Sequence, residues 1–201
     1  MSAALQSDPA FPGPPMATVP DGRDPDLRTV LGYWSTKRGG RRIPSRADID
    51  PIDIPTLLPY IGLVDVEDRP RRYRYRLVGS FIAAMWGESF QGRYLDTARH
   101  QSYRAFLHDL YTTAADGRHA LLSEAVFDYG GEAPVTIRRM ILPLAPADDA
   151  PVNMLLFANQ FSAPDLPDRS TPMSDLHMEP ALPEAALDHF EEILRQPLPL
   201  D

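Results

Sequence analysis

Arginine side chains crowd one short segment of this 201-residue chain, at residues 69–76. If residues 73–78 form a strand, Arg72, Arg74 and Arg76 point to one face, because side chains along a strand alternate with a period of two. A guanidinium group binds carboxylates and phosphates through paired hydrogen bonds. These three arginines therefore predict a site for an anion or an acidic partner protein. The alternative is a solvated strand face with local ion pairs.

Side chains with other reactive chemistry are scarce or unsuitably spaced. The chain has no cysteine, which excludes thiolate nucleophiles, thiolate metal sites and thiol adducts of a flavin. Its five histidines form no metal-binding motif, and no P-loop, dinucleotide fingerprint or nucleophile elbow occurs. The aspartates within residues 48–53 and 148–149 lie in turn-rich sequence, where aspartate caps turns. We therefore assign no catalytic residue and no metal ligand.

Apolar and aromatic side chains from several expected elements converge on one space. One polar residue, Asn159, shares the face of Phe157 if the last strand is regular. Such a mixture suits a small-molecule ligand, and it suits a filled hydrophobic core nearly as well. The candidate ligand-binding residues are Tyr75, Leu77, Met85, Trp86, Tyr103, Phe106, Phe157 and Asn159.

Helix and strand signals follow one another in an order that positions these residues. A helix is predicted from Pro25 to the stop at Gly39-Gly40, a short helix at residues 81–86, and a long one from residue 96 or 97 to Gly117. Strands are predicted at residues 61–66, 73–78, 119–129, 135–144 and 152–161, with short connections that favour antiparallel pairing. The expected fold class is α+β, a five-stranded antiparallel sheet with helices covering one face and an N-terminal flanking helix.

Proline and acidic residues concentrate at the two ends of the chain. Of the 22 prolines, six lie in residues 1–25 and seven in residues 162–201. Residues 26–161 carry 17 Lys and Arg against 16 Asp and Glu, so the net charge of −8 belongs to the ends. We expect a disordered tail at 1–25, one domain at 26–161 and an acidic tail at 162–201. In the latter, a short amphipathic helix is predicted to open at Pro183, with a stripe of Leu187, Phe190, Ile193 and Leu194.

Several short segments of the central domain follow one another in a characteristic order. They are Tyr33-Trp34, Pro44-Ser45-Arg46 with residues 48–51, Leu58-Pro59, residues 73–80 and residues 92–95. In these segments and in its order of elements, the chain resembles the PAS superfamily of sensory domains, and in particular a family of small stand-alone proteobacterial PAS-like proteins. The resemblance implies a sheet whose concave face, closed by helices, holds a small ligand or a packed core. It also makes His108 the candidate axial ligand, because haem-binding PAS domains commonly use a helical histidine near this place.

The preferred function is a non-enzymatic cytoplasmic signalling protein. We expect it to bind a small ligand, a signalling protein such as a histidine kinase, or both, and to form a homodimer. Neither nucleic acid nor a membrane is an expected partner, since no nucleic-acid reader module, signal peptide or long apolar segment occurs. The sequence names no cofactor.

Two alternatives stay open. One is a small isomerase-like α+β enzyme that uses the same cavity, which requires a carboxylate such as Asp65, Asp96 or Asp109 inside it. The other is a ligand-free dimerisation or scaffold protein, in which side chains fill the face of the sheet completely.

Overall fold

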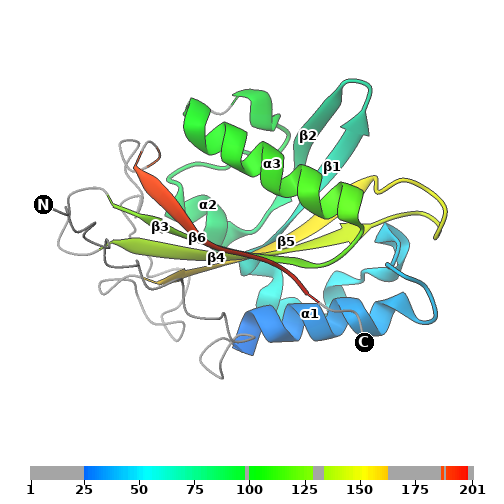
Figure 1. Ribbon diagram of the computed structural model, residues 1–201. Coiled ribbons are helices and arrows are strands. Elements are labelled where there is room, and N and C mark those ends of the chain that lie inside the picture. The colour runs from blue at the N-terminus through cyan, green and yellow to red at the C-terminus, as the bar shows by residue number, and fades with distance from the viewer. Residues whose placement is uncertain (1–24, 98–99, 129–133, 163–186, 188, 199–201) are drawn as a thin grey trace, which may run out of the picture.

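A six-stranded antiparallel sheet forms the centre of the computed structural model (Figure 1), which describes residues 25–97, 100–128, 134–162, 187 and 189–198. The strands stand in the order β2-β1-β5-β4-β3-β6. The five predicted strands are present, and a sixth is added beside β3. The strands are β1 (Ile61–Asp68), β2 (Arg71–Val78), β3 (Leu121–Phe127), β4 (Val135–Leu144), β5 (Met154–Ser162) and β6 (Phe190–Pro197).

The amphipathic helix predicted for the C-terminal segment is wrong over Phe190–Pro197, because these residues form β6. This strand pairs with β3 from Phe127 opposite Phe190 to Leu121 opposite Pro197. A helix this short is marginal in water, whereas the edge of β3 offers unpaired backbone N–H and C=O groups. Tertiary pairing therefore decides the outcome. The predicted start of that helix, at Pro183, and residues 1–24 of the predicted N-terminal tail lie outside the described residues.

The helices and the sheet form the expected α+β arrangement, with the N-terminal flanking helix on the opposite face of the sheet from the long helix. Figure 1 shows α3 (Gln101–Gly117) on one side and the flanking helix α1 (Pro25–Arg38) on the other. The indole of Trp34 on α1 is fully buried, and its Nε1 donates a hydrogen bond to the carbonyl oxygen of Pro143 on β4 at 3.0 Å. The apolar side chains of α1 thus pack against the sheet of the same domain.

The long predicted helix is present as α3, and the other helices besides α1 are short. A 3₁₀ turn (Leu95–Thr97) occupies the predicted start of the long helix, so α3 begins later, at Gln101. Arg118 ends it in the left-handed conformation, with a φ of 52°. The short helix is confirmed as α2 (Ser80–Met85). Between α1 and β1, prolines prevent a long helix, and the chain forms the 3₁₀ turns Arg46–Asp48, Pro51–Asp53 and Pro55–Tyr60.

A β-bulge interrupts the outer hairpin. Leu63 pairs with Leu77 and Val64 with Tyr75, so Arg76 is an extra residue on β2. A bulge breaks the two-residue alternation of side chains. Tyr75 is therefore buried on the α3 side, whereas Leu77 is 37% exposed.

Candidate functional site

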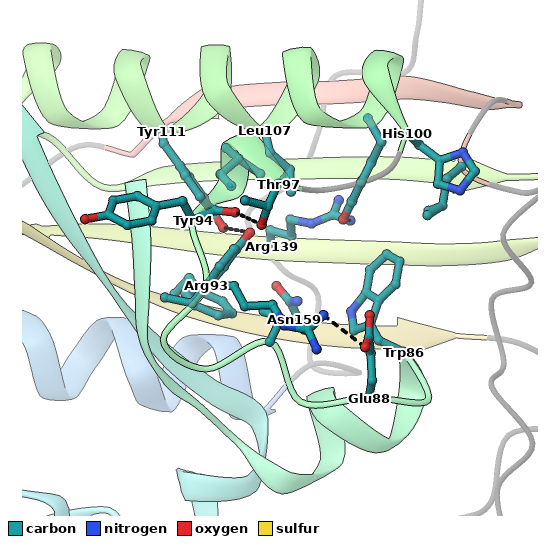
Figure 2. A pocket seen from close by; sticks show the side chains of 16 residues that line it. Trp86, Glu88, Arg93, Tyr94, Thr97, His100, Leu107, Tyr111, Arg139 and Asn159 are labelled. Carbon is teal, nitrogen blue, oxygen red and sulfur yellow. Dashed lines mark hydrogen bonds and ion pairs between the residues drawn. The ribbon is translucent and has the colours of Figure 1, made fainter. Parts of the chain in front are cut away.

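A cavity of about 190 Å³ lies between the sheet, α3 and the segment that joins α2 to α3. Figure 2 shows Arg139 and Asn159 on the sheet side, with Leu107 and Tyr111 of α3 on one flank and Trp86 on the other. Seven of the sixteen lining residues are Phe, Tyr or Trp, and six are polar or charged, a mixture that suits a small-molecule site. It consists of Tyr75, Trp86, Glu88, Phe90, Arg93, Tyr94, Leu95, Thr97, His100, Tyr103, Leu107, Tyr111, Arg139, Phe157, Asn159 and Leu187.

The floor of the cavity depends on a glycine. Gly62 of β1 stands opposite Phe157 of β5, and a Cβ at Gly62 would lie 2.2 Å from the Cζ atom of that ring. Because glycine has no side chain, the Phe157 ring can lie over β1. There it contacts Tyr75 edge-on, with 6.2 Å between the ring centroids.

The outer wall is a loop held on the free edge of β2. The Gly92 N–H donates to the Tyr75 carbonyl at 2.6 Å, and the Tyr75 N–H donates to the Arg93 carbonyl at 2.9 Å. Gly92 has a φ of 82°, a conformation that side chains other than glycine rarely adopt. At the mouth of the cavity, Glu88 and Arg93 form an ion pair at 3.0 Å, so their charges offset each other (Figure 2).

Three tyrosine hydroxyls reach the interior. The oxygens of Tyr75 and Tyr111 lie 3.4 Å apart, and Tyr103 accepts a hydrogen bond from Arg139 at 2.8 Å. Burial is the main cause that raises the pKa of each of the three phenols above 10.0. All three stay protonated at neutral pH, so each is a neutral donor and acceptor.

Two polar side chains from neighbouring strands have unused hydrogen-bonding capacity. Arg139 on β4 and Asn159 on β5 are register partners, and they are 2% and 7% exposed. Within the described part of the chain, neither the Nη1 of Arg139 nor the Oδ1 of Asn159 has a hydrogen-bond partner. Buried polar atoms of this kind are uncommon in folded proteins, and a water molecule, an ion or a ligand in the cavity would satisfy them.

Five of the eight predicted ligand-binding residues line this cavity, and three lie elsewhere. Leu77 is turned away by the bulge in β2, and Met85 is fully buried without lining the cavity. Phe106 contacts Phe190 instead, with 5.0 Å between the ring centroids. The residues that do line the cavity are Tyr75, Trp86, Tyr103, Phe157 and Asn159.

The predicted anion-binding face has its arginines in local ion pairs. Arg72 lies 2.7 Å from Asp96, and its guanidinium stacks 3.7 Å from the centroid of the Tyr94 ring. Arg74 and Arg76 share Asp65, at 2.8 and 3.5 Å. This arrangement matches the alternative of a solvated face with local ion pairs.

The other chemical candidates lie outside the cavity. Asp65 and Asp96 pair with arginines of β2, and Asp109 pairs with Arg195 at 2.5 Å. His108 packs edge-on against the Tyr73 ring at 5.1 Å and does not line the cavity. Among the residues that the structure describes, no group of three or more His, Asp or Glu side chains is placed to hold a metal ion.

Arg139 is the site residue that the sequence analysis missed. Its signal is present in the sequence, because the alternation of Val135, Ile137, Arg139 and Ile141 places a charged residue on the apolar face of a strand. The neighbouring Arg138 points to the opposite face and pairs with Glu124 at 2.6 Å. Consecutive side chains on a strand point to opposite faces, so one of the two arginines has to point to the face of the sheet that α3 covers.

Comparison with known families identifies this fold. A protein-family model described as a PAS domain matches residues 23–157, about two-thirds of the chain. The chain belongs to the PAS domain family. The matched segment includes every cavity-lining residue except Asn159 and Leu187. PAS domains have sensory and signalling roles. A search of curated proteins found no match, and none of the described helices is long and apolar enough to cross a lipid bilayer.

Proposed function

We propose that this PAS domain is a non-enzymatic sensory module of the cytoplasm that binds a small molecule in its central cavity and passes the signal to another protein by contact. The observation that carries the proposal is the cavity itself, whose lining combines aromatic rings with buried polar atoms of Arg139 and Asn159 that have no partner among the described residues. A volume of about 190 Å³ exceeds the roughly 150 Å³ of an apolar cavity that accommodates benzene. It is below the roughly 300–1,000 Å³ of sites for drug-sized ligands. The ligand is therefore a compact molecule.

The two alternative functions have less support. The carboxylates that an isomerase-like site requires, Asp65, Asp96 and Asp109, do not line the cavity, and the Glu88 carboxylate at its mouth is paired with Arg93. A ligand-free scaffold requires a completely filled sheet face, whereas open space remains beside Phe157.

A route from the cavity to the C-terminal strand supports the signalling part of the proposal. Leu187, just before β6, lines the cavity, and its carbonyl accepts a hydrogen bond from Ser102 of α3 at 3.2 Å. On β6, Phe190 contacts the Tyr103 ring, which also lines the cavity, with 5.9 Å between centroids. A ligand that moves α3 or Tyr103 thus changes the contacts that Leu187 and Phe190 make with α3.

Native mass spectrometry of freshly purified protein tests ligand binding, together with mass analysis of the small molecules released on denaturation. Leu107→Trp fills the cavity from α3, and Ala105→Trp on the exposed side of the same helix is the matched control. We expect a bound molecule in the wild type and in Ala105→Trp, and none in a folded Leu107→Trp. A wild type that carries nothing and is not stabilised by any compound of a broad metabolite library contradicts the proposal.

The proposed effect on a signalling partner is tested with the same two variants, Leu107→Trp and Ala105→Trp. We expect affinity capture to recover a signalling protein such as a histidine kinase, and the purified chain to change the phosphorylation rate of that partner. The change is expected with Ala105→Trp and not with Leu107→Trp. Recovery of only further copies of this chain across growth conditions would instead support a homodimer without a signalling partner, and size measurement by light scattering identifies that case.

A further inference from the structure

Arg139 is a permanently charged group in a buried position. A guanidinium group carries a positive charge, and the Arg139 side chain is only 2% exposed. The rings of Tyr103, Phe106 and Phe127 surround it, with their centroids 5.6–5.7 Å from Cζ. Its Nη2 donates a hydrogen bond to the Tyr103 hydroxyl at 2.8 Å. Aromatic rings stabilise a cation through their faces, but they do not neutralise its charge.

Arg139 has no counter-charge within the described part of the chain. No carboxylate there pairs with it, and its Nη1 makes no hydrogen bond. Burial of an unpaired charge is strongly unfavourable, so buried charges in proteins are normally paired. The adjacent Arg138 shows the usual arrangement, because it pairs with Glu124. An arginine that lines a cavity and has no carboxylate partner among the described residues is suited to bind an anionic ligand there.

The groups around Arg139 add hydrogen-bonding capacity on the same side of the cavity. The Tyr103 hydroxyl accepts from Arg139 and keeps its own proton to donate. Asn159, the register partner of Arg139, carries an amide that supplies donors as well as an acceptor, and its Oδ1 is unused. A guanidinium, a phenol and an amide together match the two oxygens of one carboxylate.

We propose that the ligand is a compact monocarboxylate, held by Arg139, Tyr103 and Asn159, with its apolar body against Phe157 and Leu107. This proposal deepens the proposed function and rests on it. The charge of the lining favours a single negative charge, because Glu88 and Arg93 offset each other at the mouth and leave Arg139 as the buried cation. The cavity volume restricts the apolar body to about one ring or a short chain.

The test compares charged and neutral molecules of the same shape on the full-length protein. The probes are benzoate, 4-hydroxybenzoate, phenylacetate, cyclohexanecarboxylate and hexanoate, each measured by calorimetry beside its carboxamide. We expect at least one carboxylate to bind about tenfold or more tightly than its amide, because hydrogen bonds to charged groups are the strong ones. The tightest probe should shift the NMR signal of the Arg139 guanidinium.

Variants assign the effect to Arg139. Arg139→Met removes the cation and keeps a side chain of similar length, and Arg138→Met removes the same charge from the opposite face of β4. We expect Arg139→Met to lose the preference for carboxylate over amide, and Arg138→Met to retain it. Arg139→Lys is the second variant if Arg139→Met does not fold. It keeps the charge without the paired donors, so we expect weaker binding of the carboxylate.

The outcomes separate this proposal from the function on which it rests. If no carboxylate of the panel binds, or the amides bind equally well, or Arg139→Met binds the carboxylate as the wild type does, the carboxylate proposal is overturned. If the protein carries a neutral molecule in the same cavity, only the carboxylate proposal fails. If it carries none and no library compound stabilises it, the proposed function fails as well.

Discussion

Replacement of Phe190 by alanine tests whether β6 is an integral part of this PAS domain. The Phe190 ring stacks on Phe127, with 5.4 Å between centroids and an interplanar angle of 23°, and lies 5.0 Å from Phe106. These rings in turn surround the guanidinium of Arg139. The substitution therefore removes an anchor of β6 and opens the region around the buried cation.

The expected loss of stability follows from the burial of this ring. A fully buried Phe→Ala change costs about 3–5 kcal/mol, and Phe190 is only partly buried, so about half of this, ~2 kcal/mol, is expected from lost burial. The lost aromatic pairs add about 1 kcal/mol. The free energy of unfolding should fall by about 3 kcal/mol, which corresponds to a decrease in Tm of roughly 6–12 °C for a chain of this size.

Urea unfolding, followed by tryptophan fluorescence and far-UV circular dichroism, measures the loss, and hydrogen exchange of β3 and β6 locates it. The matched control is Ile193→Ala, because Ile193 is the bulged residue of the same strand and is 43% exposed. The control should change the free energy of unfolding by less than about 0.5 kcal/mol. Equal stability of the two variants, with unchanged exchange in β3, would refute the reasoning.

Two further predictions concern the cavity floor and an acid-labile turn. Gly62→Ala should lower the free energy of unfolding by about 1–3 kcal/mol and weaken ligand binding, because the new methyl group displaces the Phe157 ring. Urea unfolding measures the stability and calorimetry the binding. Wild-type values in both measurements would contradict this prediction. Hydrogen bonds from the Ser45 hydroxyl and then from Arg41 lower the pKa of Asp48 from 3.8 to about 2. A lowered pKa stabilises the fold above pH 3.8, and this contribution is lost as the pH falls towards 2. Asp48→Asn should therefore be less stable than the wild type at pH 7, with a difference that shrinks below pH 4 in urea titrations; a difference independent of pH would contradict the assignment.

Much of the fold could be predicted from local signals. Two-residue alternation, turn residues and short connections specify the five strands of the hairpins, and the apolar stripe of α3 specifies its buried face. These signals act over a few residues, so they can be read without knowledge of the tertiary structure. The limit is visible at the start of α3, where a 3₁₀ turn replaces the first predicted helical turn.

The residues that line the cavity could be predicted only in part from the sequence. Tyr75, Trp86, Tyr103, Phe157 and Asn159 line the cavity because the elements that carry them converge on one face of the sheet. Three other predicted residues do not line it. Leu77 lies beyond a bulge, Met85 is buried in the interior and Phe106 contacts β6. A bulge depends on the pairing of two strands, and no local pattern in β2 reveals it.

The sequence by itself determined the α+β class and the presence of an arginine-rich strand. The tertiary structure alone decided that buried Arg139 has no carboxylate partner among the described residues. Arg72, Arg74 and Arg76 have carboxylates within 3.5 Å, supplied in part by distant residues, whereas Arg139 is enclosed by rings from α3 and β3. The tertiary structure also decided that Phe190–Pro197 form a strand, because these residues pair with the edge of β3. Burial and ion pairing are properties of neighbours in space, and the order of residues along a chain does not contain them directly.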